Sequence, residues 1–231
     1  MIAIVLHLHY HDLWDEFKEK IIPVLSETTH LYVTINHESD CIDDIRHHAK
    51  EVFTVENKGM DIGPFIFTYN KIQDTNYKYI VKLHTKKSLH SPGLGDWWRT
   101  GLVDSILHSN EHFNHMINFM ETNPDIFMAG SEAHFHNKLR EPYDHPNRLE
   151  AIPAIEKVNT VLNVTDHGSF FAGSMFVATT HYLNILFNNI DLEAFYNEFT
   201  EGYARGGTLA HGMERVIGYG VEKYEGRYLT L

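Results

Sequence analysis

Short apolar runs alternate with helix-like segments along the first half of the chain, and this alternation restricts the possible folds more than any other feature. Strands are predicted at residues 2–8, 31–36, 51–56 and 77–84. Helices are predicted between them, at residues 12–27, 41–50 and 62–74. The first run, IAIVLHL, is apolar throughout, as expected for a strand that is buried on both faces of a sheet. The pattern therefore predicts βαβ units around a mainly parallel sheet.

The second half is less regular. Helices are predicted at residues 95–109, 111–123, 149–163 and 207–218, strands at residues 125–131 and 170–179, and a polar loop at residues 132–147. Asp12 is the predicted N-cap of the first helix, and Thr208 and Gly218 are the predicted ends of the last. No repeat or linker interrupts the 231 residues. We therefore expect a single α/β domain, 1–231, with a mainly parallel, mixed sheet flanked by helices.

Composition excludes several classes of protein. The formal net charge of -12 does not suit a protein that binds nucleic acid. The single cysteine, Cys41, leaves no internal disulfide and suits a reducing compartment. No run reaches the roughly 18 apolar residues of a membrane span, and the start MIAIVLHLHYHD lacks the basic region of a signal peptide. We therefore expect a cytoplasmic protein, with peripheral association at the inner face of the membrane left open.

The carboxyl ends of the first four predicted strands are all polar: HLHYH, TINHESD, VENKGMD and LHTKKS follow them. Ligands of open α/β sheets bind outside this edge. In ENKGMDIGPF, Gly59 permits a tight turn, and Gly63 permits close approach of backbone or ligand. Asn57, Gly59 and Asp61 are candidate ligand-binding residues. The alternative is that Asp61 only caps the next helix and the glycines only form the turn.

The segment KLHTKKS places His84, Lys86 and Lys87 at the end of an apolar strand. A lysine at this edge is a point charge suited to phosphate oxygens, and fixed cations stabilise a diphosphate leaving group. His84 either donates a hydrogen bond to phosphate or only ends the strand. The alternative for Lys86 and Lys87 is a solvated pair of loop lysines.

The segment GDWWR adds Asp96, Trp97, Trp98 and Arg99 at the start of a predicted helix. Neighbouring helical residues point about 100° apart, so both tryptophans cannot face the core. One is expected in the core, and the other is a candidate apolar platform for a sugar ring. Arg99 is expected to bind a phosphate or to pair with Asp96.

The segment GTLAHGMERVIG places His211 and Glu214 three residues apart on a helix. A carboxylate beside a histidine can act as the general base for an acceptor hydroxyl. Glu132, Asp166 and His167 are rival candidates for this base, and a surface helix without chemistry is the alternative for the whole segment.

Histidine pairs in HLHYH and HFH would share a face of an extended strand, as two metal ligands do. No carboxylate or cysteine stands at a suitable distance to complete either site. Polar strand ends are therefore the favoured interpretation, and a histidine-based metal hydrolase is kept as a third hypothesis.

The segments ENKGMDIGPF, YIVKLHTKKS, GDWWRTGLVDSIL, FFAGSMF and GTLAHGMERVIG together resemble the successive motifs of the rhamnan synthesis protein F family. They occur in the order of that family and cover nearly the whole chain. The resemblance implies an inverting hexosyltransferase of GT-A-like, Rossmann-type fold that acts in polysaccharide assembly. It implies a nucleotide-binding half at about residues 1–95 and an acceptor-binding, catalytic half at about residues 96–231.

The implied donor is a nucleotide-diphosphate sugar, with deoxythymidine-diphospho-rhamnose (dTDP-rhamnose) as one possibility, and the implied acceptor is a polysaccharide or lipid-linked glycan. GT-A enzymes usually carry an Asp-x-Asp after the fourth strand that binds a divalent metal. Here that place reads His84, Thr85 and Lys86. No metal ligands are therefore assigned, and dependence on Mg²⁺ or Mn²⁺ stays open. A non-catalytic carbohydrate or nucleotide-sugar binding module of the same fold is the alternative function.

Overall fold

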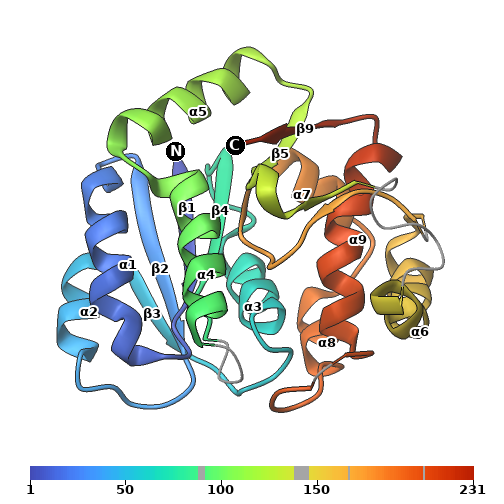
Figure 1. The fold of residues 1–231 in the computed structure, drawn as a ribbon, viewed down its shortest axis with the longest axis horizontal. Coiled ribbons are helices and arrows are strands. Elements are labelled where there is room, and N and C mark those ends of the chain that lie inside the picture. The colour runs from blue at the N-terminus through green and yellow to red at the C-terminus, as the bar shows by residue number, and fades with distance from the viewer. Residues whose placement is uncertain (88–91, 138–145, 166, 205) are drawn as a thin grey trace.

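A seven-stranded mixed sheet runs through the part of the chain that the computed structural model describes, which is residues 1–87, 92–137, 146–165, 167–204 and 206–231 (Figure 1). Its strands are β1 (Ile2–His7), β2 (Thr29–Ile35), β3 (Glu51–Thr54), β4 (Tyr79–His84), β5 (Ile126–Gly130), β8 (Phe176–Thr179) and β9 (Arg227–Thr230). Their order is β3-β2-β1-β4-β8-β5-β9.

The first four strands are mutually parallel, and β8 pairs antiparallel with both β4 and β5. The last strand, β9, is parallel to β5. The predicted α/β class with a mainly parallel, mixed sheet is therefore confirmed, and the arrangement is compatible with a GT-A-like, Rossmann-type fold.

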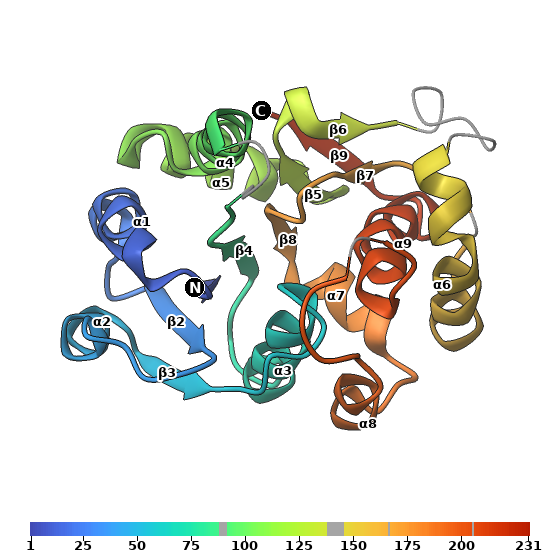
Figure 2. The ribbon, with the colours of Figure 1, turned by 60° about the horizontal axis from the view of Figure 1, so that its bottom comes forward.

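Helices cover both faces of the sheet (Figure 2). One face carries α1 (Trp14–Ile21), α2 (Ile42–His48), α4 (Pro92–Leu107) and α5 (Asn110–Thr122). The other carries α3 (Ile62–Ile72), α6 (Pro146–Leu162), α7 (Thr180–Phe187), α8 (Leu192–Asn197) and α9 (Leu209–Lys223). Short 3-10 turns occur at His11–Leu13, Ile22–Val24 and Glu132–His134.

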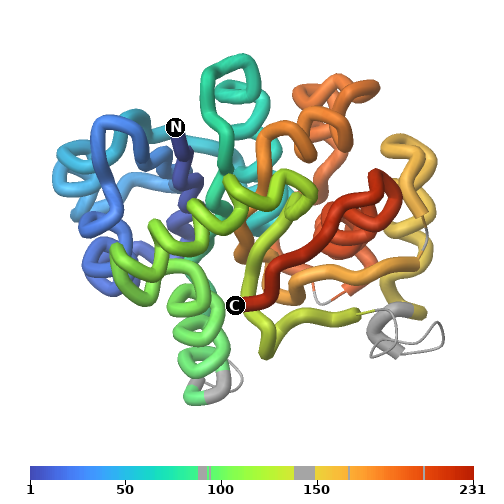
Figure 3. Tube along the Cα trace, turned by 90° about the horizontal axis from the view of Figure 1, so that it is seen from above, coloured from blue at the N-terminus to red at the C-terminus, as the bar shows by residue number. Residues whose placement is uncertain are grey.

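The edge at which β1 and β4 begin lies beside α5, where Lys78 pairs with Glu121 of α5 at 2.5 Å. Figure 3 looks down on this edge and shows α5 running across it. The candidate site described below lies at the opposite ends of β1 and β4. No helix in the described ranges is long and apolar enough to cross a membrane.

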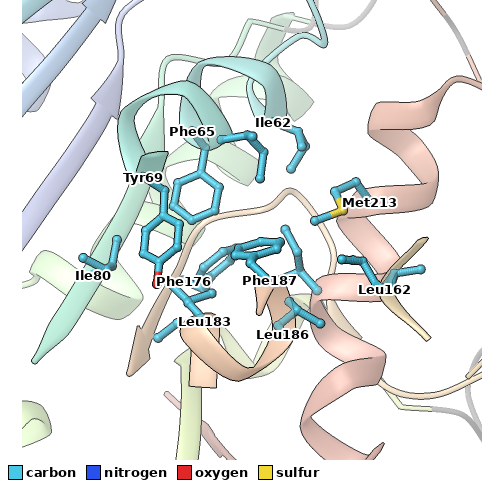
Figure 4. Packing of buried hydrophobic residues seen from close by; sticks show 14 of the residues in the cluster. Ile62, Phe65, Tyr69, Ile80, Leu162, Phe176, Leu183, Leu186, Phe187 and Met213 are labelled. Carbon is cyan, nitrogen blue, oxygen red and sulfur yellow. The ribbon is translucent and has the colours of Figure 1, made fainter. Parts of the chain in front are cut away.

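Two apolar clusters hold the layers together, because successive side chains of a strand point to opposite faces. In β1, Ala3 and Val5 belong to one cluster, and Ile4 and Leu6 belong to the other. Figure 4 shows part of the first cluster, where α3, β4, β8, α7 and α9 meet. This cluster ties the first half of the chain to the last helix.

Helices α6 and α9 pack with their backbones nearly in contact. A Cβ atom added at Gly212 of α9 would lie 2.5 Å from the carbonyl carbon of Ala154 in α6. Pro153 lies inside α6, next to this contact, and does not end the helix. The predicted helix over 149–163 is thus present, although it contains a proline.

The predicted strand over 170–179 is wrong as a single element. It is divided into β7 (Phe170–Phe171) and β8 by a turn in which Gly173 has φ +88° and Ser174 has φ +52°. Only β8 joins the main sheet, whereas β7 pairs antiparallel with β6 (Phe135–His136). The predicted loop over 132–147 therefore contains a short strand, and its residues 138–145 lie outside the described part of the chain.

Two predicted helix ends differ in the structure, and a third, Thr208, is confirmed. Helix α1 begins at Trp14, and Asp12 lies in the preceding 3-10 turn instead of capping the helix. Helix α9 continues past Gly218 to Lys223, and Gly218 lies inside it at a close contact, where a Cβ atom would lie 2.4 Å from the Cβ atom of Phe170. Thr208 is the N-cap residue of α9, but its side chain makes no capping bond.

Candidate functional site

The candidate site lies where β1 and β4 end, side by side. His7 and His84 are the last residues of these strands and are paired in register. The starts of α3 and α9 and the turn between β7 and β8 complete the site. Both helices belong to the apolar cluster on one face of the sheet, so the packing of that face brings these distant segments together.

Asp61 and Lys82 form a buried ion pair at the centre of this site. The Lys82 Nζ atom lies 2.5 Å from Asp61 Oδ2, and the lysine side chain is only 1% exposed. Asp61 occupies the N-cap position of α3, but its carboxylate makes no capping hydrogen bond. The His84 Nδ1 atom lies 3.6 Å from the same oxygen. The ion pair, and not capping, therefore sets the position of the Asp61 carboxylate.

Glu214 of α9 is held against the turn between β7 and β8. Its Oε1 atom accepts hydrogen bonds from the backbone N–H of Gly173 at 2.8 Å and from the Ser174 hydroxyl at 3.0 Å. Lys82 Nζ donates a hydrogen bond to the carbonyl oxygen of Ser174 at 2.8 Å. A continuous chain of contacts thus runs from Asp61 through Lys82 and Ser174 to Glu214.

Burial and charge act on the titratable groups of this chain of contacts in opposite directions. Burial lowers the pKa of Lys82, and the Asp61 carboxylate opposes that shift. Burial alone would raise the pKa of Asp61, but His84 and the Lys82 and Lys86 ammonium groups outweigh it and hold that pKa below its ordinary value. Burial lowers the pKa of His84 to about 3. At neutral pH, Asp61 is therefore ionised and His84 is neutral.

Lys86 and Lys87 differ in what surrounds their charges. The Lys86 ammonium lies 4.6 Å from the centre of the Trp98 ring, which stacks on His134 with ring centres 5.5 Å apart. No carboxylate pairs with Lys86 among the described residues. Lys87, in contrast, forms an ion pair with Asp12. Lys86 is thus the better placed of the two to meet an external anion.

The Arg99 guanidinium makes its hydrogen bonds to other groups of the protein. It makes two hydrogen bonds of 2.8 Å to the Glu16 carboxylate, one of 2.9 Å to Asp96, and one of 2.8 Å to the backbone oxygen of Lys86. These bonds join α1, α4 and the loop after β4. Trp97 is 63% exposed at the start of α4. Trp98 packs inward against His134, so the predicted division between the two tryptophans is present.

The loop with Asn57 and Gly59 is bound to the segment that precedes α9. The Asn57 carbonyl accepts from the N–H of Gly202 at 2.7 Å, and the Gly59 N–H donates to Thr200 at 2.9 Å. Gly59 has φ +68°, and a Cβ there would lie 2.6 Å from the Phe199 ring. The glycine therefore forms the predicted turn and also permits this packing.

The predicted partner of Glu214 and its rivals lie in different environments. His211 Nδ1 is 2.8 Å from the Thr208 hydroxyl, and no hydrogen bond joins His211 to Glu214 in the described part of the chain. Burial lowers the pKa of His211, and Glu214 opposes that shift. Glu132, one of the rival candidates, follows β5 and is exposed to solvent. The backbone N–H of His167, another rival, donates a hydrogen bond to the Thr165 hydroxyl oxygen at 3.3 Å. Asp166 lies outside the described residues.

The described residues do not fit a divalent metal ion at this edge. Asp61 already carries the Lys82 ammonium on Oδ2, and within the described ranges no group of three or more His, Cys, Asp or Glu residues is arranged to hold an ion. In the HLHYH segment, His7 Nδ1 lies 2.9 Å from the Thr34 hydroxyl, and His9 Nδ1 lies 2.9 Å from Asn36 Oδ1. These histidines thus contact neighbouring polar side chains of β2 and the loop after it.

A hollow of about 470 Å³ lies elsewhere, at the beginning of β4. Tyr77, Lys78, Thr180 and His181 are among the residues that line it. None of the site residues predicted from the sequence lines this hollow. The candidate site is therefore defined by its cluster of charged and hydrogen-bonding groups.

Two members of this cluster, Lys82 and Ser174, were not expected from the sequence. Lys82 interrupts the apolar run YIVKLH, and a lysine in a strand buried on both faces needs an internal partner. That signal was present in the sequence. The role of Ser174 depends on the turn that divides the predicted strand, for which FFAGSMF offers only an internal glycine.

Comparison with known proteins gives one family and two curated relatives. The family model described as Rhamnan synthesis protein F matches residues 1–225. The relatives, both with the name Uncharacterized protein WxcX, come from two strains of Xanthomonas campestris pv. campestris and are each 30% identical over 235 residues. The matches cover 99% of this chain and 32% of each relative, so the chain spans about a third of their length. The match over almost all of its residues shows that the chain belongs to the rhamnan synthesis protein F family.

Proposed function

We propose that the protein is a glycosyltransferase that moves a sugar from a nucleotide-diphosphate donor to a glycan acceptor in polysaccharide synthesis. The observation that carries this proposal is that the Glu214 carboxylate lies in one cluster with Asp61, Lys82 and Lys86 at the carboxyl ends of the strands of an α/β sheet, where ligands of such sheets bind. The family name supports rhamnose as the first donor sugar to test.

In this proposal, the donor diphosphate meets Lys86, whose charge is not balanced by a carboxylate among the described residues. Asp61 Oδ2 faces Lys82, so Oδ1 is the oxygen that can accept a hydrogen bond from the sugar or ribose. Because His84 is neutral, it can donate a hydrogen bond to a phosphate oxygen without adding charge.

Glu214 is the proposed general base. Both of its hydrogen bonds use Oε1, and Oε2, which lies 3.8 Å from the Arg215 guanidinium, is the oxygen proposed to take the proton. As the acceptor oxygen bonds to the anomeric carbon, Glu214 takes the hydroxyl proton, and the bond from that carbon to the phosphate oxygen breaks. The nucleoside diphosphate leaves with the electron pair, and Lys86 stabilises its charge. A single displacement of this kind inverts the anomeric centre.

The test compares the wild type with Glu214→Gln, using dTDP-rhamnose and other nucleotide sugars with a glycan acceptor. We expect normal donor affinity and a loss of turnover of about 10²–10⁴-fold, the usual value of general base assistance. Turnover near the wild-type rate would move the base to a rival such as Glu132 or His167. Donor binding without turnover in the wild type would instead favour a nucleotide-sugar binding module.

The same assay with EDTA tests the role of the lysines. If Lys86 neutralises the diphosphate, transfer continues after chelation. Loss of transfer that Mn²⁺ restores would contradict this assignment of Lys86.

A further inference from the structure

Lys82 is a charged residue in an otherwise apolar place. It lies in the middle of β4, is 1% exposed, and has the rings of Phe65 and Phe176 at 5.8 Å and 5.9 Å from its ammonium group. A buried ammonium is costly unless it is paired and hydrogen-bonded. An apolar side chain would fill this position at less cost to stability, so the contacts of Lys82 suggest a role other than packing.

Those contacts join three separate segments of the chain. The ammonium group donates to Asp61 at the start of α3 and to the carbonyl of Ser174, which is 92 residues away in the sequence. The two distances are 2.5 Å and 2.8 Å. One side chain of β4 thus holds the carboxylate on the proposed donor side and the turn between β7 and β8.

The turn that Lys82 holds is conformationally strained. Ser174 has φ +52°, a region that non-glycine residues seldom adopt, and such conformations persist only where their surroundings fix them. The same turn donates both hydrogen bonds that orient Glu214. Lys82 and Glu214 thus contact the same turn.

We propose that Lys82 is the positioning residue of the site, which fixes Asp61 and, through the turn at Gly173 and Ser174, the carboxylate of Glu214. Its consequence for turnover rests on the proposed function, but its effect on the turn does not. Lys82 touches neither donor nor acceptor in this proposal. It acts by holding two groups that do.

The test measures hydrogen exchange of the Gly173 amide, which donates to Glu214, relative to the amides of β1. Lys82→Met keeps an unbranched apolar side chain and removes the ammonium group. Lys78→Met is the control, because Lys78 immediately precedes β4, at the edge of the sheet away from the candidate site, and its substitution also removes a carboxylate partner, Glu121. We expect relative exchange at Gly173 to rise by about tenfold or more in Lys82→Met and to stay unchanged in Lys78→Met.

A second variant, Asp61→Asn combined with Lys82→Met, removes both buried charges and separates positioning from charge compensation. We expect it to regain the thermal stability that Lys82→Met loses, while Gly173 still exchanges fast, because the Ser174 carbonyl still lacks its donor. This variant also serves for the measurement if Lys82→Met does not fold. Normal Gly173 protection in the double variant, or equal exchange in Lys82→Met and Lys78→Met, would overturn the proposal.

Turnover provides a separate readout. A misplacement of about 1 Å at a catalytic group can cost about 100-fold in rate, and we expect a loss of up to that size in Lys82→Met. If the wild type consumes no nucleotide sugar, the proposed function fails, and Gly173 exchange still decides whether Lys82 positions the turn.

Discussion

The cations around the candidate site differ in how far the protein already neutralises them. Lys82 faces Asp61, Lys87 faces Asp12, and Arg99 faces Glu16 and Asp96. Lys86 instead lies over Trp98, whose ring holds its ammonium group by a cation–π contact. An incoming phosphate would have to displace a carboxylate from Lys87 or Arg99, but not from Lys86.

Lys86→Ala should therefore weaken the binding of dTDP or UDP by about tenfold or more, since a hydrogen bond to a charged group contributes roughly 1.5–3 kcal/mol. Lys87→Ala is the matched control, and we expect it to change the affinity by less than about threefold, because its partner Asp12 already screens it. Isothermal titration calorimetry measures both. Equal losses in the two variants would contradict the distinction between the lysines.

At the level of elements, the contact between α6 and α9 depends on the absence of a side chain at Gly212. A Cβ there would meet backbone atoms of Ala154 and Ile155, at 2.5 Å and 2.9 Å, and backbone cannot rotate away as a side chain can. The position of α9, and with it Glu214, is thus coupled to the packing of α6.

Gly212→Ala should destabilise the protein by about 1–3 kcal/mol, the usual cost of overpacking. Gly93→Ala in α4 is the control, because a Cβ there meets nothing within 4 Å. The control should be neutral or slightly stabilising, since alanine favours helix more than glycine does. Urea unfolding measures both free energies. A Gly212→Ala variant as stable as the control would show that α6 can move aside.

The elements that the sequence predicted best are those with a clear period. The alternation of strands and helices up to His84 predicted the parallel half of the sheet, and the polar strand ends indicated the edge at which the candidate site lies. The division of residues 170–179 was not predictable in the same way, because it depends on which sheet each half joins. Lys86 and Glu214 were candidates by residue type, whereas the contacts of Lys82 needed the folded structure.

For the molecule as a whole, several buried histidines link stability to pH. Burial lowers the pKa of His7 and of His84 to about 3, from an ordinary value of 6.5. Between these two values, the unfolded chain binds protons that the folded chain does not. The free energy of unfolding must therefore fall as the pH is lowered from 6.5 towards 3.

The slope of that dependence is measurable by urea unfolding at a series of pH values. Each of the two histidines contributes up to about 1.4 kcal/mol per pH unit in this window. His84→Asn should reduce the slope, because it removes one of the two histidines whose pKa is lowered by burial. An unaltered slope in His84→Asn would mean that His84 is protonated in the folded protein.

Strand β8 lies next to β4 in the sheet but comes much later in the sequence, and this separation affects how the chain folds. Until β8 pairs with it, β4 is the outer strand of the β3-β2-β1-β4 block, with unpaired backbone groups that can recruit strands of other chains. A charge in the middle of such a strand opposes this, and Lys82 is that charge. Lys82, the proposed positioning residue of the site, therefore also opposes aggregation of the chain before β8 has paired with β4. We expect refolding of Lys82→Met to lose more protein to aggregates than refolding of Lys78→Met.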